Sequence, residues 1–82
     1  MHTGLMWFDN DPRTALSVKI QRASDYYKQK FGRLPDLCLV NPGMLGEKQL
    51  EAIEERGMQI TIRAYRPVLP GHFWIGIEEE NS

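Results

Sequence analysis

The stretch LPDLCLVNPGMLG, residues 34–46, sets the centre of the expected fold. Its core is the unbroken apolar run LCLV at residues 37–40, which is bounded by Pro35 on one side and by the turn-forming Asn41-Pro42-Gly43 on the other. A short apolar run without two-residue alternation is typical of a strand that is covered on both faces. We therefore expect this segment to be the buried centre of a sheet, with Cys38 packed there as a small hydrophobic residue.

The residues before this run predict a strand followed by a long helix. Residues 5–8 are apolar, and Asp11 and Pro12 then suit the N-cap and the first position of a helix. Gly32 is expected to end that helix in the left-handed conformation. Apolar residues recur between these limits at intervals of three or four, which predicts one core-facing stripe: Leu16, Ile20, Ala23, Tyr27 and Phe31.

The residues after the run predict a second, shorter helix and two more strands. Between Gly43 and Gly57, Leu50 and Ile53 are spaced to face inward while glutamates form an outer face. Residues 59–66 and 72–78 alternate apolar and polar side chains, as half-buried strands do. A proline-rich connector at 67–71 separates these two strands, which we expect to be antiparallel neighbours.

The resulting order, βαβαββ, predicts an α/β domain bordering on α+β: a two-layer sandwich of a mixed four-stranded sheet and two helices. Parallel pairing is favoured among the first three strands, with the fourth antiparallel at an edge. The length of 82 residues allows a single domain, 1–82, in which 78–82 are expected to form a frayed acidic tail. One sheet face is expected to stay open and to carry Thr61, Arg63, Tyr65 and Trp74.

The composition limits the classes of function that we expect for the protein. Ten Lys and Arg against eleven Asp and Glu give a formal net charge of −1, so nothing draws the whole chain to nucleic acid or to an anionic membrane. A single cysteine excludes an internal disulfide and fits a reducing compartment. No apolar segment approaches the length of about 20 residues that a membrane span needs. We expect a cytoplasmic protein without a membrane partner.

Three segments resemble small bacterial proteins that have no assigned function: WFDND at 7–11, KIQRASDYYKQKFGRLPDLCLVNPG at 19–43 and RPVLPGHFWIG at 66–76. The resemblance spans most of the chain and implies a cytoplasmic domain, but it implies no catalytic residues. The strand order is also similar to part of a thioredoxin-like fold. The chain lacks a Cys-x-x-Cys pair, so no residues would carry a dithiol redox role.

The ends of the strands offer one candidate site. Asp9 and Asp11 follow the first strand, Asn41 follows the second, and His72 would reach the same edge if the third strand is parallel. Carboxylate and amide oxygens are ligands that Mg²⁺ prefers, so these residues suggest a metal-dependent site for a phosphate or a nucleotide. Helix capping and turn formation explain the same residues without a metal, and we favour that interpretation, with no cofactor.

Two further candidate surfaces lie in the second half of the chain. Arg63, Tyr65, Arg66 and Trp74 could stack on and pair with a single-stranded nucleic acid, although the net charge favours a purely structural role for them. The apolar residues around the proline-rich connector suggest a surface for a protein partner or for a second copy of the chain: Val68, Leu69, Phe73 and Trp74.

The favoured function is therefore a non-enzymatic protein-interaction module or homodimeric accessory protein. No serine or cysteine is placed as a nucleophile, because Ser17 and Ser24 fall in the expected helix and Cys38 falls in the buried strand. The alternatives are the metal-dependent site at the strand ends and single-strand nucleic-acid binding on the open sheet face.

Overall fold

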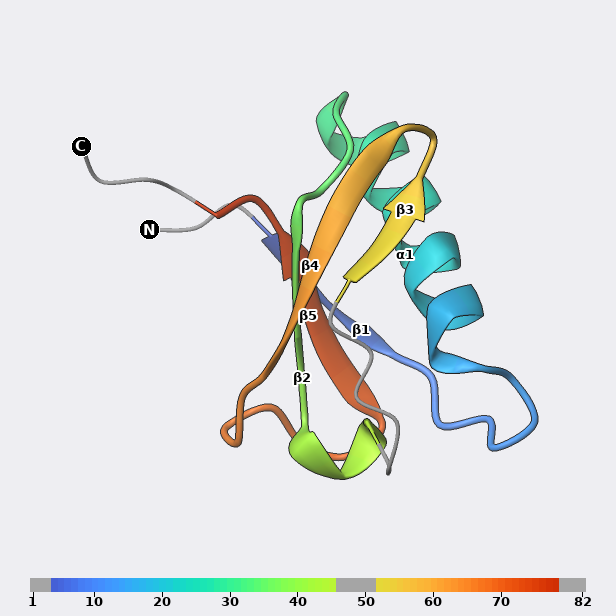
Figure 1. The fold of residues 1–82 in the computed structure, drawn as a ribbon, viewed down its shortest axis with the longest axis vertical. Helices are drawn as coiled ribbons and strands as arrows, with labels where there is room; N and C mark the ends of the chain where they lie inside the picture. Colours follow the sequence, from blue (N-terminus) through green and yellow to red (C-terminus); the bar gives the residue numbers. More distant parts are fainter. Residues whose placement is uncertain (1–3, 46–51, 79–82) are drawn as a thin grey trace.

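A computed structural model describes residues 4–45 and 52–78, which form one helix packed on one mixed sheet (Figure 1). The elements in chain order are β1 (Gly4–Phe8), α1 (Leu16–Phe31), β2 (Leu37–Val40), the 3-10 helix η1 (Pro42–Met44), β3 (Ala52–Glu55), β4 (Met58–Ala64) and β5 (His72–Gly76). The class is α+β. The expected two-layer mixed sheet is confirmed, but the described residues form five strands and one α-helix rather than four strands and two helices.

The sheet has the strand order β1-β5-β2-β4-β3. β2 and β4 pair in parallel, whereas β1 with β5, β5 with β2 and β3 with β4 pair antiparallel. β1 and β2 run in the same direction but are separated by β5, so β1, α1 and β2 form a split crossover unit. The first three predicted strands correspond to β1, β2 and β4, and the parallel pairing predicted among them is correct only for β2 with β4. The last strand is antiparallel as expected, but it lies inside the sheet and not beside β4.

Helix α1 covers one face of the sheet and buries the middle of the stripe that its sequence predicts. Ile20, Ala23 and Tyr27 are fully buried, Leu16 packs at the margin and Phe31 is exposed. β2 lies third of the five strands, so its predicted central position is confirmed. The sheet contributes the other half of the core through side chains from its three inner strands: Cys38, Val40, Ile60, Ile62, Phe73 and Ile75.

The beginning of α1 differs from the expectation. The helix starts at Leu16, and its N-cap is Ala15, whose side chain makes no capping hydrogen bond. Asp11 instead closes a turn: its carboxylate accepts from the backbone N–H of Arg13 at 2.9 Å and from the Thr14 hydroxyl at 2.9 Å. Prediction and structure diverge because an Asp-Pro pair suits such a turn as well as it suits a helix start. The C-terminal prediction is confirmed, since Gly32 adopts φ 81° and donates to Lys28 O.

The predicted second helix is wrong over its described part. Ile53 belongs to strand β3, which joins β4 through a two-residue turn at Arg56 and Gly57. Both turn residues have positive φ, 51° and 81°, as a type I′ hairpin turn requires. Leu50 lies outside the described residues.

Glu78, the first residue of the predicted acidic tail, has fixed partners in the structure. Glu78 is fixed by its backbone N–H, which donates to Asp36 Oδ1 at 2.8 Å, and its carboxylate pairs with Arg63. Residues 79–82 lie outside the described part of the chain.

Candidate functional site

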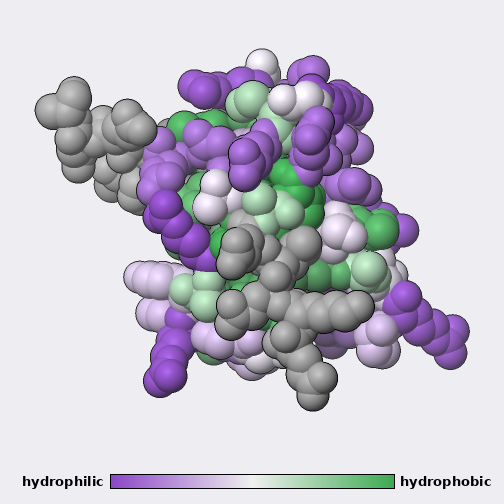
Figure 2. Space-filling view, viewed as in Figure 1, coloured by the Kyte–Doolittle hydropathy of each residue, from purple (hydrophilic) through white to green (hydrophobic). Residues whose placement is uncertain are grey.

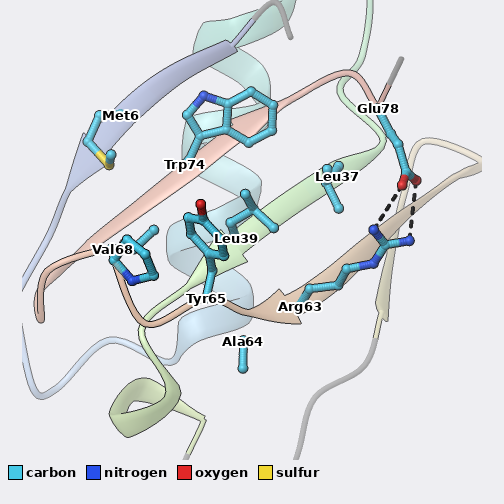
Figure 3. Close-up of a pocket in the computed structure, with 10 residues that line it drawn as sticks. Met6, Leu37, Leu39, Arg63, Ala64, Tyr65, Val68, Trp74 and Glu78 are labelled. Atoms are coloured by element: carbon cyan, nitrogen blue, oxygen red, sulfur yellow. Dashed lines mark hydrogen bonds and ion pairs between the residues drawn. The ribbon is translucent and has the colours of Figure 1, made fainter. Parts of the chain in front are cut away.

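The sheet face opposite α1, called the open face from here on, carries a hollow of about 680 Å³. One row of paired residues crosses four strands beneath it: Met6 of β1, Trp74 of β5, Leu39 of β2 and Arg63 of β4. Side chains of paired residues project to the same side of a sheet, so this row is a consequence of the strand order. Figure 3 shows the row with α1 behind the sheet.

The lining of the hollow is mostly apolar, with two aromatic side chains. Figure 3 shows Leu39 between Trp74 and Tyr65, with Leu37 and Val68 on either side. The two charged residues of the lining, Arg63 and Glu78, lie together at one end of the hollow. The full lining is Met6, Leu37, Leu39, Arg63, Ala64, Tyr65, Pro67, Val68, Trp74 and Glu78.

The proline-rich connector between β4 and β5 forms one side of the hollow. Val68 is folded inward and is only 4% exposed, whereas its neighbour Leu69 is 66% exposed. Two hydrogen bonds hold this conformation: Val68 N–H donates to Tyr65 O at 3.1 Å, and Asn41 Nδ2 donates to Val68 O at 2.8 Å. The connector is therefore a fixed part of the wall.

An ion pair closes the opposite end of the hollow. Arg63 Nη1 lies 2.8 Å from Glu78 Oε1, and Nη2 lies 3.4 Å from Oε2, so the pair is bidentate. The two side chains are 54% and 40% exposed, and an exposed pair of this kind contributes about 0–1 kcal/mol to stability. Its main effect is positional, because Asp36 anchors the backbone of Glu78 and Glu78 in turn orients the guanidinium.

The structure brings together most of the predicted nucleic-acid residues. Arg63, Tyr65 and Trp74 line the one hollow, on the face that the alternation of residues 59–66 and 72–78 predicts. Arg66 is exposed but does not line the hollow. The carboxylate of Glu78 against Arg63 reduces the positive charge that a phosphate backbone would meet.

The predicted interface residues are divided between the core and the surface. Trp74 and Val68 line the hollow, and Leu69 is exposed beside it. Phe73 is fully buried against the helix side, because it alternates with Trp74 along β5. Its side chain does not reach a surface that a partner could contact.

The candidate metal residues lie at one edge of the sheet, where β1 and β2 end and β5 begins. Asp9 N–H donates to Gly71 O at 2.9 Å, which joins the β1 exit to the β5 entry. The side chains have local roles. Asn41 Oδ1 accepts from Gly43 N–H at 2.9 Å, and His72 Nδ1 lies 3.1 Å from Pro70 O with its ring 4.7 Å from that of Phe8.

The two aspartates at this edge are also engaged. The buried Lys19 ammonium donates to Asp9 O at 2.9 Å and lies 3.8 Å from Asp9 Oδ1. The hydrogen bonds from Arg13 N–H and then from the Thr14 hydroxyl hold the pKa of Asp11 below its ordinary value. Within residues 4–45 and 52–78, no group of three or more His, Cys, Asp or Glu side chains is placed to hold a metal ion.

Cys38 is buried in the core as its sequence position predicts. Burial raises the pKa of its thiol from 9.0 to about 12, so the thiolate that a nucleophile or a metal ligand needs is scarce at neutral pH.

Six lining residues were not predicted to take part in a site: Met6, Leu37, Leu39, Ala64, Pro67 and Glu78. Leu37 and Leu39 follow from strand alternation, because they must face away from Cys38 and Val40. Met6 and Glu78 join the hollow only through the placement of β5 between β1 and β2, which no local pattern reveals.

No protein-family model matches the chain, and no similar curated protein or solved structure is found. Within the described ranges, no helix has the length and the apolar character needed to cross a membrane.

Proposed function

We propose that the protein is a non-enzymatic protein-interaction module that takes apolar side chains of a partner protein into the hollow on its open face. The observation that carries this proposal is the apolar, aromatic-walled hollow of about 680 Å³ on a sheet face that no helix of the described residues covers. Pockets that anchor a partner's side chains are typically of this kind, with fixed walls and a polar rim. The buried, single cysteine supports a reducing, cytoplasmic setting.

Several features of the hollow suit a binding role. Its connector wall is fixed by two hydrogen bonds, and its charged end by the bidentate pair of Arg63 with Glu78. A preformed site loses little conformational entropy on binding. In the view of Figure 2, hydrophilic residues make up much of the visible surface, with hydrophobic residues between them.

Selection of random peptides on the immobilised protein tests this proposal. We expect the selected peptides to be rich in apolar and aromatic residues and to lose binding to the Leu39→Glu variant, which places a carboxylate in the middle of the hollow. The Val18→Glu variant, which adds the same charge to an exposed position of α1, is expected to bind them normally. Equal binding to both variants would contradict the proposal.

A second candidate is single-stranded nucleic-acid binding at the same hollow, supported by the joint presence of Arg63, Tyr65 and Trp74. Its test is fluorescence anisotropy with oligothymidylate at two salt concentrations. Affinity that falls with salt and falls again on Arg63→Ala would favour it over the protein partner, and no binding at low salt would remove it.

A further inference from the structure

The two edges of the sheet differ in a way that bears on self-association. Among the described residues, β1 and β3 are the terminal strands of the sheet, so each has one row of backbone N–H and C=O groups that faces no strand of residues 4–45 and 52–78. β3 carries Glu54 and Glu55, and charged side chains of this kind discourage edge-to-edge pairing. β1 has the sequence GLMWF and carries no charge.

The exposed side chains of β1 are large and apolar. Met6 is 55% exposed and Phe8 is 58% exposed, and both project from the open face. The Phe8 ring is nonetheless fixed against the ring of His72, with 4.7 Å between their centroids. An ordered, apolar edge strand without a charged residue is suited to pair with a strand of another molecule.

The backbone of β1 presents hydrogen-bonding groups on the side of the strand that faces away from β5. Asp9 N–H donates to Gly71 O in continuation of the β1 and β5 register, and hydrogen-bonding direction alternates along a strand. The N–H and C=O groups of Leu5 and Trp7 therefore face β5. Those of Gly4, Met6 and Phe8 face away from the sheet.

We propose that the free edge of β1 is the interface for a second copy of this chain, with the two β1 strands antiparallel about a two-fold axis at Met6. In this register Met6 opposes Met6 of the second copy, and Gly4 opposes Phe8. These are the residues whose backbone groups face outward, so each pair exchanges two N–H···O bonds. Leu5 opposes Trp7 on the helix side.

The register is self-complementary in side chains as well as in backbone. The indole of Trp74 covers Gly4, so Phe8 of the second copy would meet an aromatic ring above the glycine. Every opposed pair is apolar. Pairing β3 with β3 would instead bring glutamates of the two copies together, and pairing β1 with β3 would generate an open chain of molecules and no closed dimer.

The dimer would be a continuous sheet with both helices on one side and both hollows on the other, because a two-fold axis between antiparallel strands is perpendicular to the sheet. Formation of this dimer does not depend on what binds in the hollow. A single strand pair buries less than the roughly 800 Å² per partner of an ordinary interface. We therefore expect the dissociation constant of the dimer to be micromolar or higher.

Sedimentation equilibrium over a wide concentration range tests the dimer. The wild-type chain is expected to dimerise, and Phe8→Lys is expected to weaken the association at least about tenfold by placing a charge on the edge. Met6→Pro removes an outward-facing N–H and should do the same without disturbing the pairing of β1 with β5. Leu69→Lys adds the same charge at an exposed residue off the edge and should leave the dimer unchanged.

Amide hydrogen exchange distinguishes this interface from any other. At high concentration the amides of Met6 and Phe8 should exchange more slowly, and in Phe8→Lys this slowing should disappear. If Met6→Pro does not fold, the Phe8→Lys variant and the exchange data still decide the matter. A wild-type chain that stays monomeric at the highest concentration would overturn the proposal, and so would a dimer that Leu69→Lys disrupts and Phe8→Lys does not.

Discussion

The indole ring of Trp74 occupies the space that a side chain at Gly4 would need. A Cβ atom at Gly4 would overlap Trp74 Cζ2 and Cε2 and would lie 2.7 Å from Ile75 O. The glycine is thus what allows Trp74 to lie flat against β1 at the margin of the hollow. This contact links the edge strand to the candidate site.

Gly4→Ala should therefore destabilise the protein by about 1–3 kcal/mol, since the ring and the strand must move apart. Urea unfolding measures the loss, and the tryptophan emission of the folded state should shift. In a Trp74→Ala background the same substitution should cost clearly less, because the larger of the two clashes is gone. An equal cost in both backgrounds would show that the backbone contact with Ile75, and not the indole, sets the requirement.

The N-cap of α1 can be changed so as to stabilise the helix. Ala15 occupies the N-cap with extended backbone dihedrals and offers no side-chain acceptor to the free N–H groups. Ala15→Asp should supply that acceptor and raise the free energy of unfolding by about 0.5–1 kcal/mol. Ala15→Leu serves as the control and should give no gain. Thermal unfolding of both variants makes the comparison, and equal melting temperatures would show that the turn around Asp11 already satisfies the helix start.

The turn between β3 and β4 requires glycine at its second position. Gly57 has φ 81° with open space around it, so the cost of Gly57→Ala is one of backbone conformation alone. We expect a loss of about 1 kcal/mol in the free energy of unfolding, measured by urea titration. Arg56→Asn, which places a residue that tolerates positive φ at the first turn position, should not destabilise beyond the small loss of the exposed Arg56 and Asp25 pair.

Stability should fall at alkaline pH because of Cys38. Its pKa in the folded state is about 12 against 9.0 for the free thiol, so the unfolded chain loses the proton first. The stabilisation is complete below pH 9 and is lost as the pH rises from about 9 to about 12. Urea midpoints measured from pH 7 to pH 11 in parallel with Cys38→Ala check this. The variant should be less stable at pH 7, yet its midpoint should fall less over that range.

Local patterns in the sequence predicted β1, α1, β2, β4 and β5, together with the face of the sheet on which Arg63, Tyr65 and Trp74 lie. They placed the start of α1 at Asp11 and Pro12 instead of Leu16. β3 escaped prediction because Ile53 stands among glutamates at helical spacing. Its pairing with Ile60 across a tight turn outweighs that local preference. The position of β5 between β1 and β2 depends on burying Phe73 and Ile75 in the middle of the sheet, and neighbours in sequence do not reveal it.

Part of the candidate site is predictable from the sequence in the same way. Strand alternation alone places Arg63 of β4, Tyr65 just after it and Trp74 of β5 on one face. Joining them to Met6 and Leu39 in a single row requires the strand order, and placing Glu78 beside Arg63 requires the anchor at Asp36. Asn41 has the turn role that its sequence predicts, whereas Asp11 closes a turn and does not cap α1.

Isothermal titration with a selected peptide tests the central claim most directly, because two exposed tyrosines provide a matched pair of variants. Tyr65 lines the hollow and is 49% exposed, whereas Tyr26 lies on α1 and is 47% exposed. We expect Tyr65→Ala to weaken binding about tenfold or more and Tyr26→Ala to leave it unchanged. Weakening by Tyr26→Ala with full binding by Tyr65→Ala would contradict the assignment of the hollow as the binding site.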